Sequence, residues 1–355
     1  MSIDLNARVR TPKAIRLGDL ALQTNTNVVG DPDTLITGVG AIGSAKAGEI
    51  TFLSEKKYRH FLPTLAASAV ILPAEEAADC TIPALIAADP KLVFAQIVAI
   101  LYPHQTVEPA VHPTAVIGKT SQIHPNAHIG AHCVIGERVT IGANVVLQAG
   151  CHVADDCSIG EGTVLYPHVS IYHSTTIGNN CVLHSGVVIG SDGFGFAKNK
   201  EKWFKVPQIG GVKIGDRVDI GANTTIDRGA IDDTEIGNDV ILDNLIQIGH
   251  NVKIGDGTAI AACCGIAGSA IIGKHCLIAG GSRVNGHINI CDFVVIIGCS
   301  NVGQSITKPG AYASAITTME MKLWKKNLVR FHQLDSLALR LFNVEKKLNH
   351  VELIK

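Results

Sequence analysis

Aromatic side chains are scarce in this sequence, in which phenylalanine, tryptophan and tyrosine together make up only 5% of the 355 residues. Glycine is abundant in comparison, with 36 residues. Large rings fill much of the core of a globular sandwich, whereas a thin aliphatic core needs few of them. The composition therefore favours an elongated solenoid, in a chain long enough for about two or three structural units.

A strong net charge and long apolar runs are also lacking. The formal net charge is −1 at pH 7, which argues against a general nucleic-acid-binding protein. No run of apolar residues reaches the roughly 18 needed to cross a bilayer, so we expect no integral membrane segment. The first ten residues, MSIDLNARVR, lack the apolar core of a secretory signal. We therefore expect a cytoplasmic protein.

The sequence does contain a repeat of aliphatic residues with a period of six. Every sixth residue is aliphatic from Val111 to Ile189 and again from Ile236 to Val302. This period matches neither an α-helix nor a flat β-strand. It is typical of a parallel β-helix, in which three faces form a coil of about 18 residues and coils stack about 4.8 Å apart. The period alone does not define the handedness of the coil.

Cysteine is frequent, with ten residues, but its spacing is that of the repeat. No C-x-x-C motif occurs, so neither a redox motif nor a zinc site with that spacing is indicated. Most of the cysteines take the small position four residues after a repeated aliphatic residue, and we interpret them as small buried hydrophobic residues rather than as a disulfide framework. They are Cys133, Cys151, Cys157, Cys181, Cys264 and Cys276.

The repeat divides the chain into three predicted parts. Residues 1–102 lack the period and read as a small α/β domain, followed by a β-helix domain at 103–317. Residues 318–355 have the three- and four-residue apolar spacing of a helix, with a basic run at 322–330. Within the first part we expect a short helix at 15–21, strands at 68–72 and 84–88, and a helix at 91–101.

Residues 190–213 interrupt the repeat and hold much of the aromatic content of the chain. Phe194, Phe196, Trp203 and Phe204 all lie in this stretch. We expect a long loop, and long loops on rigid scaffolds often carry function. The alternative is that these rings only cover an exposed patch of the β-helix. The glycines of the stretch do not form a nucleotide-binding fingerprint, because no helix is expected to follow them.

His250 is the candidate catalytic residue that the repeat itself suggests. It follows a glycine corner, and Asp243 lies seven residues earlier, where a carboxylate could orient the imidazole. Gly268 lies one coil further on, so its bare N–H is a candidate oxyanion donor. His287 follows about two coils after His250. The other corner histidines read as polar side chains facing water: His112, His124, His132, His152 and His168.

Metal binding is the competing use for clustered histidines. A zinc site needs three or four converging ligands, and His250 with His287 supplies only two. No third histidine falls in register with them, so we expect no metal in this site. A general base and an oxyanion donor act without a metal or redox cofactor, so we expect no cofactor.

Several stretches of the chain resemble a known family. The repeat resembles the left-handed β-helix hexapeptide acyltransferases, and the longer motifs are similar to those of the N-acyltransferases that act on UDP-3-O-(3-hydroxyacyl)glucosamine in lipid A synthesis. The resemblance covers nearly the whole chain. Its motifs are ITFLSEKKY (50–58), GSDGFGFA (190–197), PQIGGVKIGDRVDIGANTTIDRGA (207–230), DNLIQIGHNV (243–252) and NGH (285–287).

The resemblance implies a left-handed β-helix homotrimer with active sites between adjacent subunits. It implies that His250 is the general base for the 2-amino group of the sugar, that Asp243 orients it, and that the Gly268 amide stabilises the oxyanion. His287 would assist nearby. Residues 1–102 would hold the uridine nucleotide, with Phe52 and Tyr58 stacking on the base. The donor would be a 3-hydroxyacyl chain on acyl carrier protein, an acidic partner that suits the basic run at 322–330.

One departure and several alternatives remain. Residues 298–305 are small and polar where bulkier side chains are expected to close the acyl pocket, which predicts an acyl chain of different, longer length. A related O-acyltransferase acting on UDP-N-acetylglucosamine, or a CoA-dependent sugar acetyltransferase, is the nearest alternative activity. A non-catalytic solenoid scaffold and a metal-dependent hydratase on the same fold are alternatives of other classes.

Overall fold

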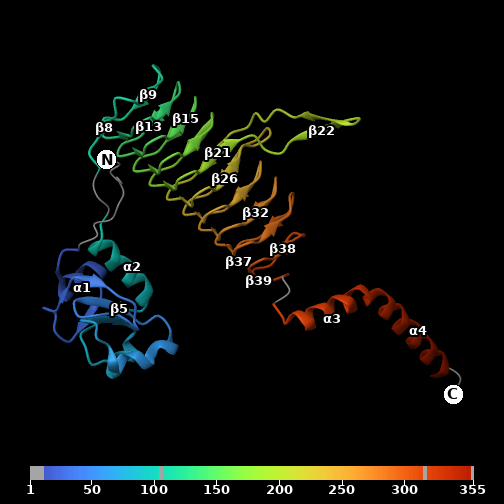
Figure 1. Ribbon diagram of the computed structural model, residues 1–355, viewed down its shortest axis with the longest axis horizontal. Helices are drawn as coiled ribbons and strands as arrows, with labels where there is room; N and C mark the ends of the chain where they lie inside the picture. Colours follow the sequence, from blue (N-terminus) through green and yellow to red (C-terminus); the bar gives the residue numbers. More distant parts are fainter. Residues whose placement is uncertain (1–11, 104–106, 315–317, 353–355) are drawn as a thin grey trace. The chain divides into compact units, whose positions relative to one another are not determined.

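The computed structural model describes residues 12–103, 107–314 and 318–352. It divides into two compact units, Met1–Ala110 and Val111–Lys355, which are coloured from blue to red along the chain in Figure 1. Residues 1–10, in which no secretory core was expected, lie outside the described residues. No described helix has the length and apolar character needed to cross a membrane.

The N-terminal unit is a five-stranded sheet with helices, as expected for an α/β domain. The sheet has the order β2 (Asn27–Val29), β7 (Ala84–Ile86), β6 (Ala69–Leu72), β5 (Glu49–Phe52) and β4 (Gly38–Val39), and only the β2–β7 pair is antiparallel. Two α-helices, α1 (Leu17–Thr24) and α2 (Pro90–Leu101), pack against it, with 3-10 segments at Lys56–Thr64 and Ala74–Asp79. The helix α2 begins where Asp89 accepts hydrogen bonds from the N–H groups of Lys91 and Leu92.

The expected elements of this unit are largely present, with one difference. The expected strands at 68–72 and 84–88 correspond to β6 and β7, and the expected helix at 91–101 corresponds to α2. The expected helix at 15–21 begins only at Leu17, because Ile15 and Arg16 form the short strand β1, which pairs antiparallel with β3 (Leu35–Ile36). Pairing with a distant segment therefore overrides the local helical pattern.

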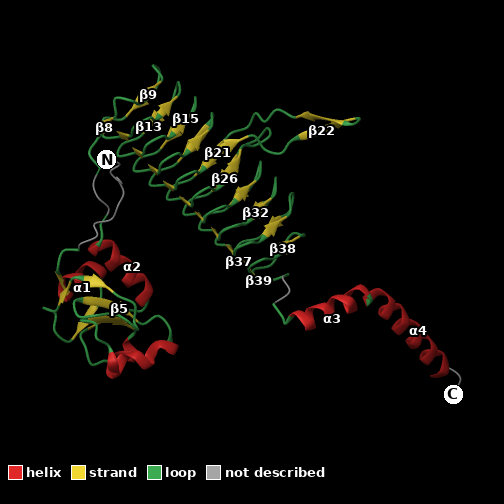
Figure 2. Cartoon of the chain, in the orientation of Figure 1, coloured by secondary structure: helices red, strands yellow, loops and turns green. Residues whose placement is uncertain are grey.

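The second unit is a parallel β-helix with three faces, which Figure 2 shows as stacked short strands. In the coil that contains His250, the three faces are formed by β28 (Ile241–Leu242), β29 (Gln247–Ile248) and β30 (Lys253–Ile254). His250 lies between β29 and β30. The three strands belong to parallel sheets of 11, 10 and 9 strands respectively, and we name each face by these strands. In uninterrupted coils the strand residues that lie opposite each other are 18 residues apart, as predicted from the six-residue period.

The core of the β-helix is a column of the repeated aliphatic side chains. Leu165, Leu183 and Ile248 are fully buried, in one cluster that runs through the described coils. All six cysteines at the small corner position are buried and free, which agrees with their interpretation as small hydrophobic residues. Burial raises the pKa of the Cys157 thiol to about 11, as expected for a sulfur packed in an apolar core.

The interruption at 190–213 is more regular than the loop that the sequence predicted. It contains an antiparallel hairpin, β22 (Phe196–Asn199) with β23 (Lys202–Lys205), which extends from the β-helix in Figures 1 and 2. Cross-strand hydrogen bonding over four residue pairs explains the difference. Trp203 is 68% exposed in the described chain.

The C-terminal segment is helical, as the apolar spacing predicted. It forms α3 (Met321–His332) and α4 (Leu334–Glu352). No residue of α3 is buried. The apolar stripe of α4 is exposed at the positions whose side chains are described, namely Leu334, Leu337, Leu341, Val344 and Leu348.

Candidate active site

His250 lies at the corner between the β29 and β30 faces, where its ring is confined by two glycines. It is half-buried, directly after the strand β29. A Cβ atom on Gly268 would lie 2.6 Å from His250 Nε2, and a Cβ on Gly193 would lie 2.6 Å from the His250 Cβ. The absence of side chains at these two positions therefore allows the imidazole to lie flat against the corner.

The side chain of Asn251 determines which nitrogen of His250 carries the proton. Its Nδ2 group donates to the carbonyl of Asp232 (2.8 Å), and its Oδ1 accepts from the N–H of Ala230 (2.9 Å). The same Oδ1 lies 3.0 Å from His250 Nδ1, so Nδ1 must be the donor in that contact. The neutral ring then keeps its free lone pair on Nε2, the nitrogen that lies beside Gly268.

A short insertion in the preceding coil supplies the partners of Asn251. Hydrogen-bonded positions are 22 residues apart across this coil instead of 18, which leaves four additional residues. They lie near 229–232, where Ala230 and Asp232 offer the backbone groups that hold the Asn251 amide. These four inserted residues therefore have a structural role at this corner, because they hold the side chain of Asn251.

Replacing Asn251 by alanine is expected to lower kcat for the reaction proposed below by about 10- to 100-fold with little change in KM, because the imidazole loses its fixed tautomer and orientation. In an N251D variant the carboxylate still accepts from Nδ1 but favours the protonated ring. We expect partial recovery of kcat, with the acid limb of the pH–rate profile moved to higher pH. An N251A enzyme with wild-type kcat would contradict the role of Asn251.

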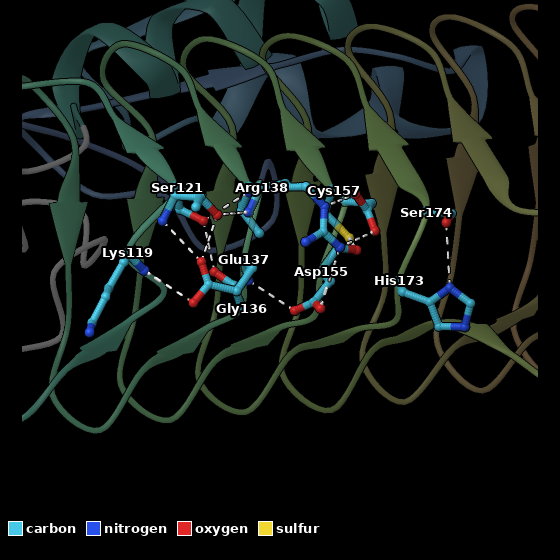
Figure 3. A network of polar contacts seen from close by, with 12 residues as sticks. Lys119, Ser121, Gly136, Glu137, Arg138, Asp155, Cys157, His173 and Ser174 are labelled. Carbon is cyan, nitrogen blue, oxygen red and sulfur yellow. Dashed lines mark hydrogen bonds and ion pairs between the residues drawn. The ribbon is translucent and has the colours of Figure 1, made fainter.

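The backbone N–H of Gly268 is free of a hydrogen-bond partner in the part of the chain that the structure describes, and comparison with the same corner in earlier coils explains why. Figure 3 shows the same corner in earlier coils, where the N–H of Lys119 donates to Glu137 Oε1 (3.2 Å) and the N–H of Glu137 donates to Asp155 Oδ1 (2.9 Å). In each case the side chain one coil later caps the amide. One coil after Gly268 stands Gly286, which has no side chain, and within the described residues the Gly268 N–H has no acceptor. It can therefore donate to a substrate oxygen.

His287 lies at this corner and Asp243 does not. The N–H of His287 donates to the Gly268 carbonyl (3.2 Å), and its side chain is exposed. Asp243 follows β28, one corner earlier, where its carboxylate accepts from the N–H groups of Asn244 (2.8 Å) and Ala262 (3.0 Å). It has no hydrogen bond or ion pair to His250 among the described residues, so its role as the orienting carboxylate stays a prediction that these contacts do not support.

Asp227 is a carboxylate of this corner that reasoning from the sequence missed. It ends the strand β26 (Thr225–Asp227), which pairs with β29 so that Ile226 is opposite Ile248. Continuing this register places Asp227 opposite Gly249, next to His250. The stretch that contains Asp227 is one of the motifs quoted above, but its position relative to His250 depends on the four inserted residues. A count of 18 residues therefore could not find it.

The two aromatic residues proposed for nucleotide binding have different surroundings. Phe52 stacks on Phe94 with ring centroids 4.4 Å apart. It also lines a cavity of about 390 Å³ together with Ser54, Glu55, Asp89, Pro90 and Lys91. Tyr58 is not part of this lining; it packs in a separate apolar cluster, with Lys57 Nζ 4.8 Å from its ring centre. The structure therefore places Phe52, but not Tyr58, at this cavity.

No group of three or more histidine, cysteine, aspartate or glutamate residues that could hold a metal ion occurs within residues 12–103, 107–314 and 318–352. Around the ring of His250 the structure places Asn251, Gly193 and Gly268. The groups that the structure describes at this corner can transfer a proton at His250 Nε2 and donate a hydrogen bond to an oxyanion from the Gly268 N–H.

Comparison with known families gives matches along most of the chain. The profile of the LpxD family, described as UDP-3-O-(3-hydroxymyristoyl) glucosamine N-acyltransferase, matches residues 33–100. The bacterial transferase hexapeptide profile matches four stretches, 114–149, 139–173, 156–191 and 233–268. A hexapeptide repeat profile of succinyl-transferases matches residues 208–228.

Individual proteins are similar over nearly their full length. A UDP-3-O-acylglucosamine N-acyltransferase of Coxiella burnetii is 47% identical over 331 residues, which cover 93% of this chain and 97% of that protein. Its counterpart in Pseudomonas savastanoi pv. phaseolicola is 46% identical over 95% of this chain and 96% of its own length. Among solved structures, an Arabidopsis UDP-N-acetylglucosamine acyltransferase is 25% identical with a TM-score of 0.52, covering 61% of this chain and 77% of that one.

Proposed function

This chain belongs to the UDP-3-O-acylglucosamine N-acyltransferases, left-handed β-helix enzymes of lipid A biosynthesis, and we propose that its acyl donor is a 3-hydroxyacyl chain carried by acyl carrier protein. The acceptor is UDP-3-O-acylglucosamine, whose free 2-amino group becomes the amide nitrogen. The proposal for the donor is supported by the basic run within α3, which suits an acidic carrier and consists of Lys322, Lys325, Lys326 and Arg330.

The observation that carries the proposed mechanism is the free lone pair of His250 Nε2 beside the free N–H of Gly268. Nε2 removes a proton from the 2-amino group as its nitrogen attacks the thioester carbonyl carbon. The Gly268 N–H donates to the oxygen that becomes negative in the tetrahedral intermediate. When the C–S bond breaks, the imidazolium returns its proton to the thiolate, and the amide and a free thiol are released.

The remaining residues have supporting roles in this proposal. Asn251 holds Nδ1–H of His250 and so takes the orienting role within one chain. We retain His287 as an assisting residue, because its N–H holds the carbonyl of Gly268 and its exposed side chain can reach bound substrate. Phe52 stacks on the uracil base in the cavity of the N-terminal unit, and Tyr58 is assigned to the same nucleotide with less support from its position.

We further propose that three copies of the chain assemble and that the enzyme works in the cytoplasm, where acyl carrier protein is available. Exposed aliphatic side chains on the β28 face, such as Ile241 and Leu277, support burial against a second copy. The exposed apolar stripe of α4 supports a contact of the same kind.

The acyl-length prediction concerns the last coils. A cavity of about 310 Å³ is lined by Ile296, Val302, Ile306 and Tyr312, by polar residues of 300–305, and by small residues such as Gly303 and Ala313. Small side chains there leave room for a longer chain, so we expect kcat/KM to rise from a shorter 3-hydroxyacyl donor to one that is two carbons longer. A sharp preference for the shorter donor would contradict this prediction, and bulky substitutions at Gly303 are expected to reverse the order.

The proposed function is tested by mass spectrometry of the sugar nucleotide after incubation with 3-hydroxyacyl carrier protein. We expect an N-acylated product from UDP-3-O-acylglucosamine and none from UDP-N-acetylglucosamine. Product from the second acceptor would indicate the O-acyltransferase alternative, and product with acetyl-CoA the acetyltransferase alternative. No product with any acceptor, from a folded protein that supports lipid A synthesis in cells, would favour a scaffold.

A further inference from the structure

Asp227 lies beside the proposed base, in the strand of the preceding coil. The strand β26 pairs in parallel with β29, and its register sets Thr225 opposite Gln247 and Ile226 opposite Ile248. Continuing this register places Asp227 opposite Gly249, the residue that precedes His250. The carboxylate therefore belongs to the same corner as Nε2, although the proposed mechanism does not use it.

Two uncharged side chains fix the direction of this carboxylate. Ser191 Oγ donates to Asp227 Oδ1 (3.1 Å), and Gln247 Nε2 donates to Oδ2 (2.9 Å). Gln247 is itself held, because its Nε2 also donates to the Ile248 carbonyl (3.2 Å) and its Oε1 accepts from the Thr225 hydroxyl. Carboxylate oxygens accept more than one hydrogen bond each, so Asp227 keeps acceptor capacity for a ligand.

The carboxylate has no cationic partner in the described part of the chain. Among the described residues, no side-chain nitrogen of lysine, arginine or histidine lies within 4.0 Å of the Asp227 carboxylate oxygens. The adjacent Arg228 is buried and turns away, with its guanidinium hydrogen-bonded to the ring and carbonyl of His173. Burial raises the pKa of Asp227, which is the expected effect on a half-buried carboxylate without a counter-charge.

A carboxylate in this position is suited to bind a cation supplied by the substrate. We propose that Asp227 binds the protonated 2-amino group of the acceptor sugar and holds its nitrogen beside His250 Nε2. This inference rests on the proposed function, because the acceptor of an N-acyltransferase carries a free amine. The ammonium must release one proton to solvent before its lone pair can attack, and Asp227 positions the nitrogen before that step. His250 Nε2 then takes the second proton as the N–C bond forms. A sugar with an acetylated nitrogen carries no charge there and gains nothing from the carboxylate.

The test compares the binding of UDP-glucosamine and UDP-N-acetylglucosamine to the full-length protein by calorimetry. In wild type we expect the amine to bind more tightly, and in D227N we expect the ratio of the two Kd values to fall by about fivefold, the contribution of one half-exposed ion pair. With the complete acceptor, D227N should raise KM by a similar factor and leave kcat nearly unchanged. The matched control is D219N, since Asp219 is also desolvated but pairs with His184 (3.7 Å) away from this corner.

The outcomes separate this inference from the function on which it rests. The inference is overturned if folded D227N keeps the wild-type Kd ratio, or if wild type binds both sugars equally. The proposed function still holds in either case if wild type N-acylates the acceptor. Wild-type protein that neither binds these nucleotides nor N-acylates overturns both. If D227N does not fold, D227S serves instead, because serine keeps a hydrogen-bonding group toward Gln247 without the charge. The inference is supported if D227S shows the same loss of preference and D219N does not.

Discussion

Replacing His250 by alanine is expected to lower kcat/KM for N-acylation by about 10²–10⁴-fold, the usual contribution of a general base. In the structure Nδ1 of His250 is committed to Asn251 Oδ1 (3.0 Å), so Nε2 is the nitrogen left to accept the proton of the attacking amine. Initial rates with the carrier-protein donor and the amine acceptor measure the effect. Acceptor binding should change little, because the imidazole acts mainly in the transition state.

The control for this variant is His124→Ala. His124 is an exposed corner histidine in an early coil, and its Nδ1 accepts from the N–H of Asn126 (3.1 Å). We expect H124A to retain wild-type activity. An H250A enzyme that loses less than about tenfold, with the fold intact by circular dichroism, would show that another group removes the proton.

Replacing Gly268 by alanine is expected to lower kcat by about 10²–10³-fold, the size of effect seen when an oxyanion donor is lost. The added Cβ would lie 2.6 Å from His250 Nε2, which is closer than a methyl carbon approaches an atom to which it is not bonded. The ring must move, and its new position separates the base from the amide that stabilises the oxyanion. The substitution thus disturbs both parts of the site with one methyl group.

The matched control for G268A is Gly265→Ala, three residues earlier in the same coil. A Cβ on Gly265 would meet nothing within 4 Å. We therefore expect G265A to keep both its melting temperature and its activity. If G268A kept wild-type kcat as well, the ring of His250 could not be working from its position against Gly268, and the proposed geometry would be wrong.

The repeat made most of the β-helix predictable. Because each coil buries the same kind of side chain at the same angle, the aliphatic register from Val111 to Ile189 and from Ile236 to Val302 was sufficient to predict the three faces. The burial of the six corner cysteines followed from the same register. The position of Gly268 relative to His250 was also predictable, since no insertion separates them.

Two expectations went beyond what the period of six can specify. The hairpin of β22 and β23 was expected as an irregular loop, because its strands are stabilised by pairing with each other and not by the repeat. Asp243 was expected to orient His250 from its separation in the sequence, yet its carboxylate is bonded to backbone N–H groups at another corner. Separation along the chain does not specify the direction of a side chain.

By itself, the sequence determined the β-helix with its helical and α/β flanking parts, and it placed Gly268 one coil after His250 at the same corner. The reason is that residues buried at a regular interval stack in register from coil to coil. Only the tertiary structure decided which neighbours complete that corner. Asn251 reaches backbone groups of an insertion, and Asp227 comes next to His250 only after four extra residues shift the register to 22. Contacts made across an insertion depend on how the extra residues fold, and no count of residues contains that information.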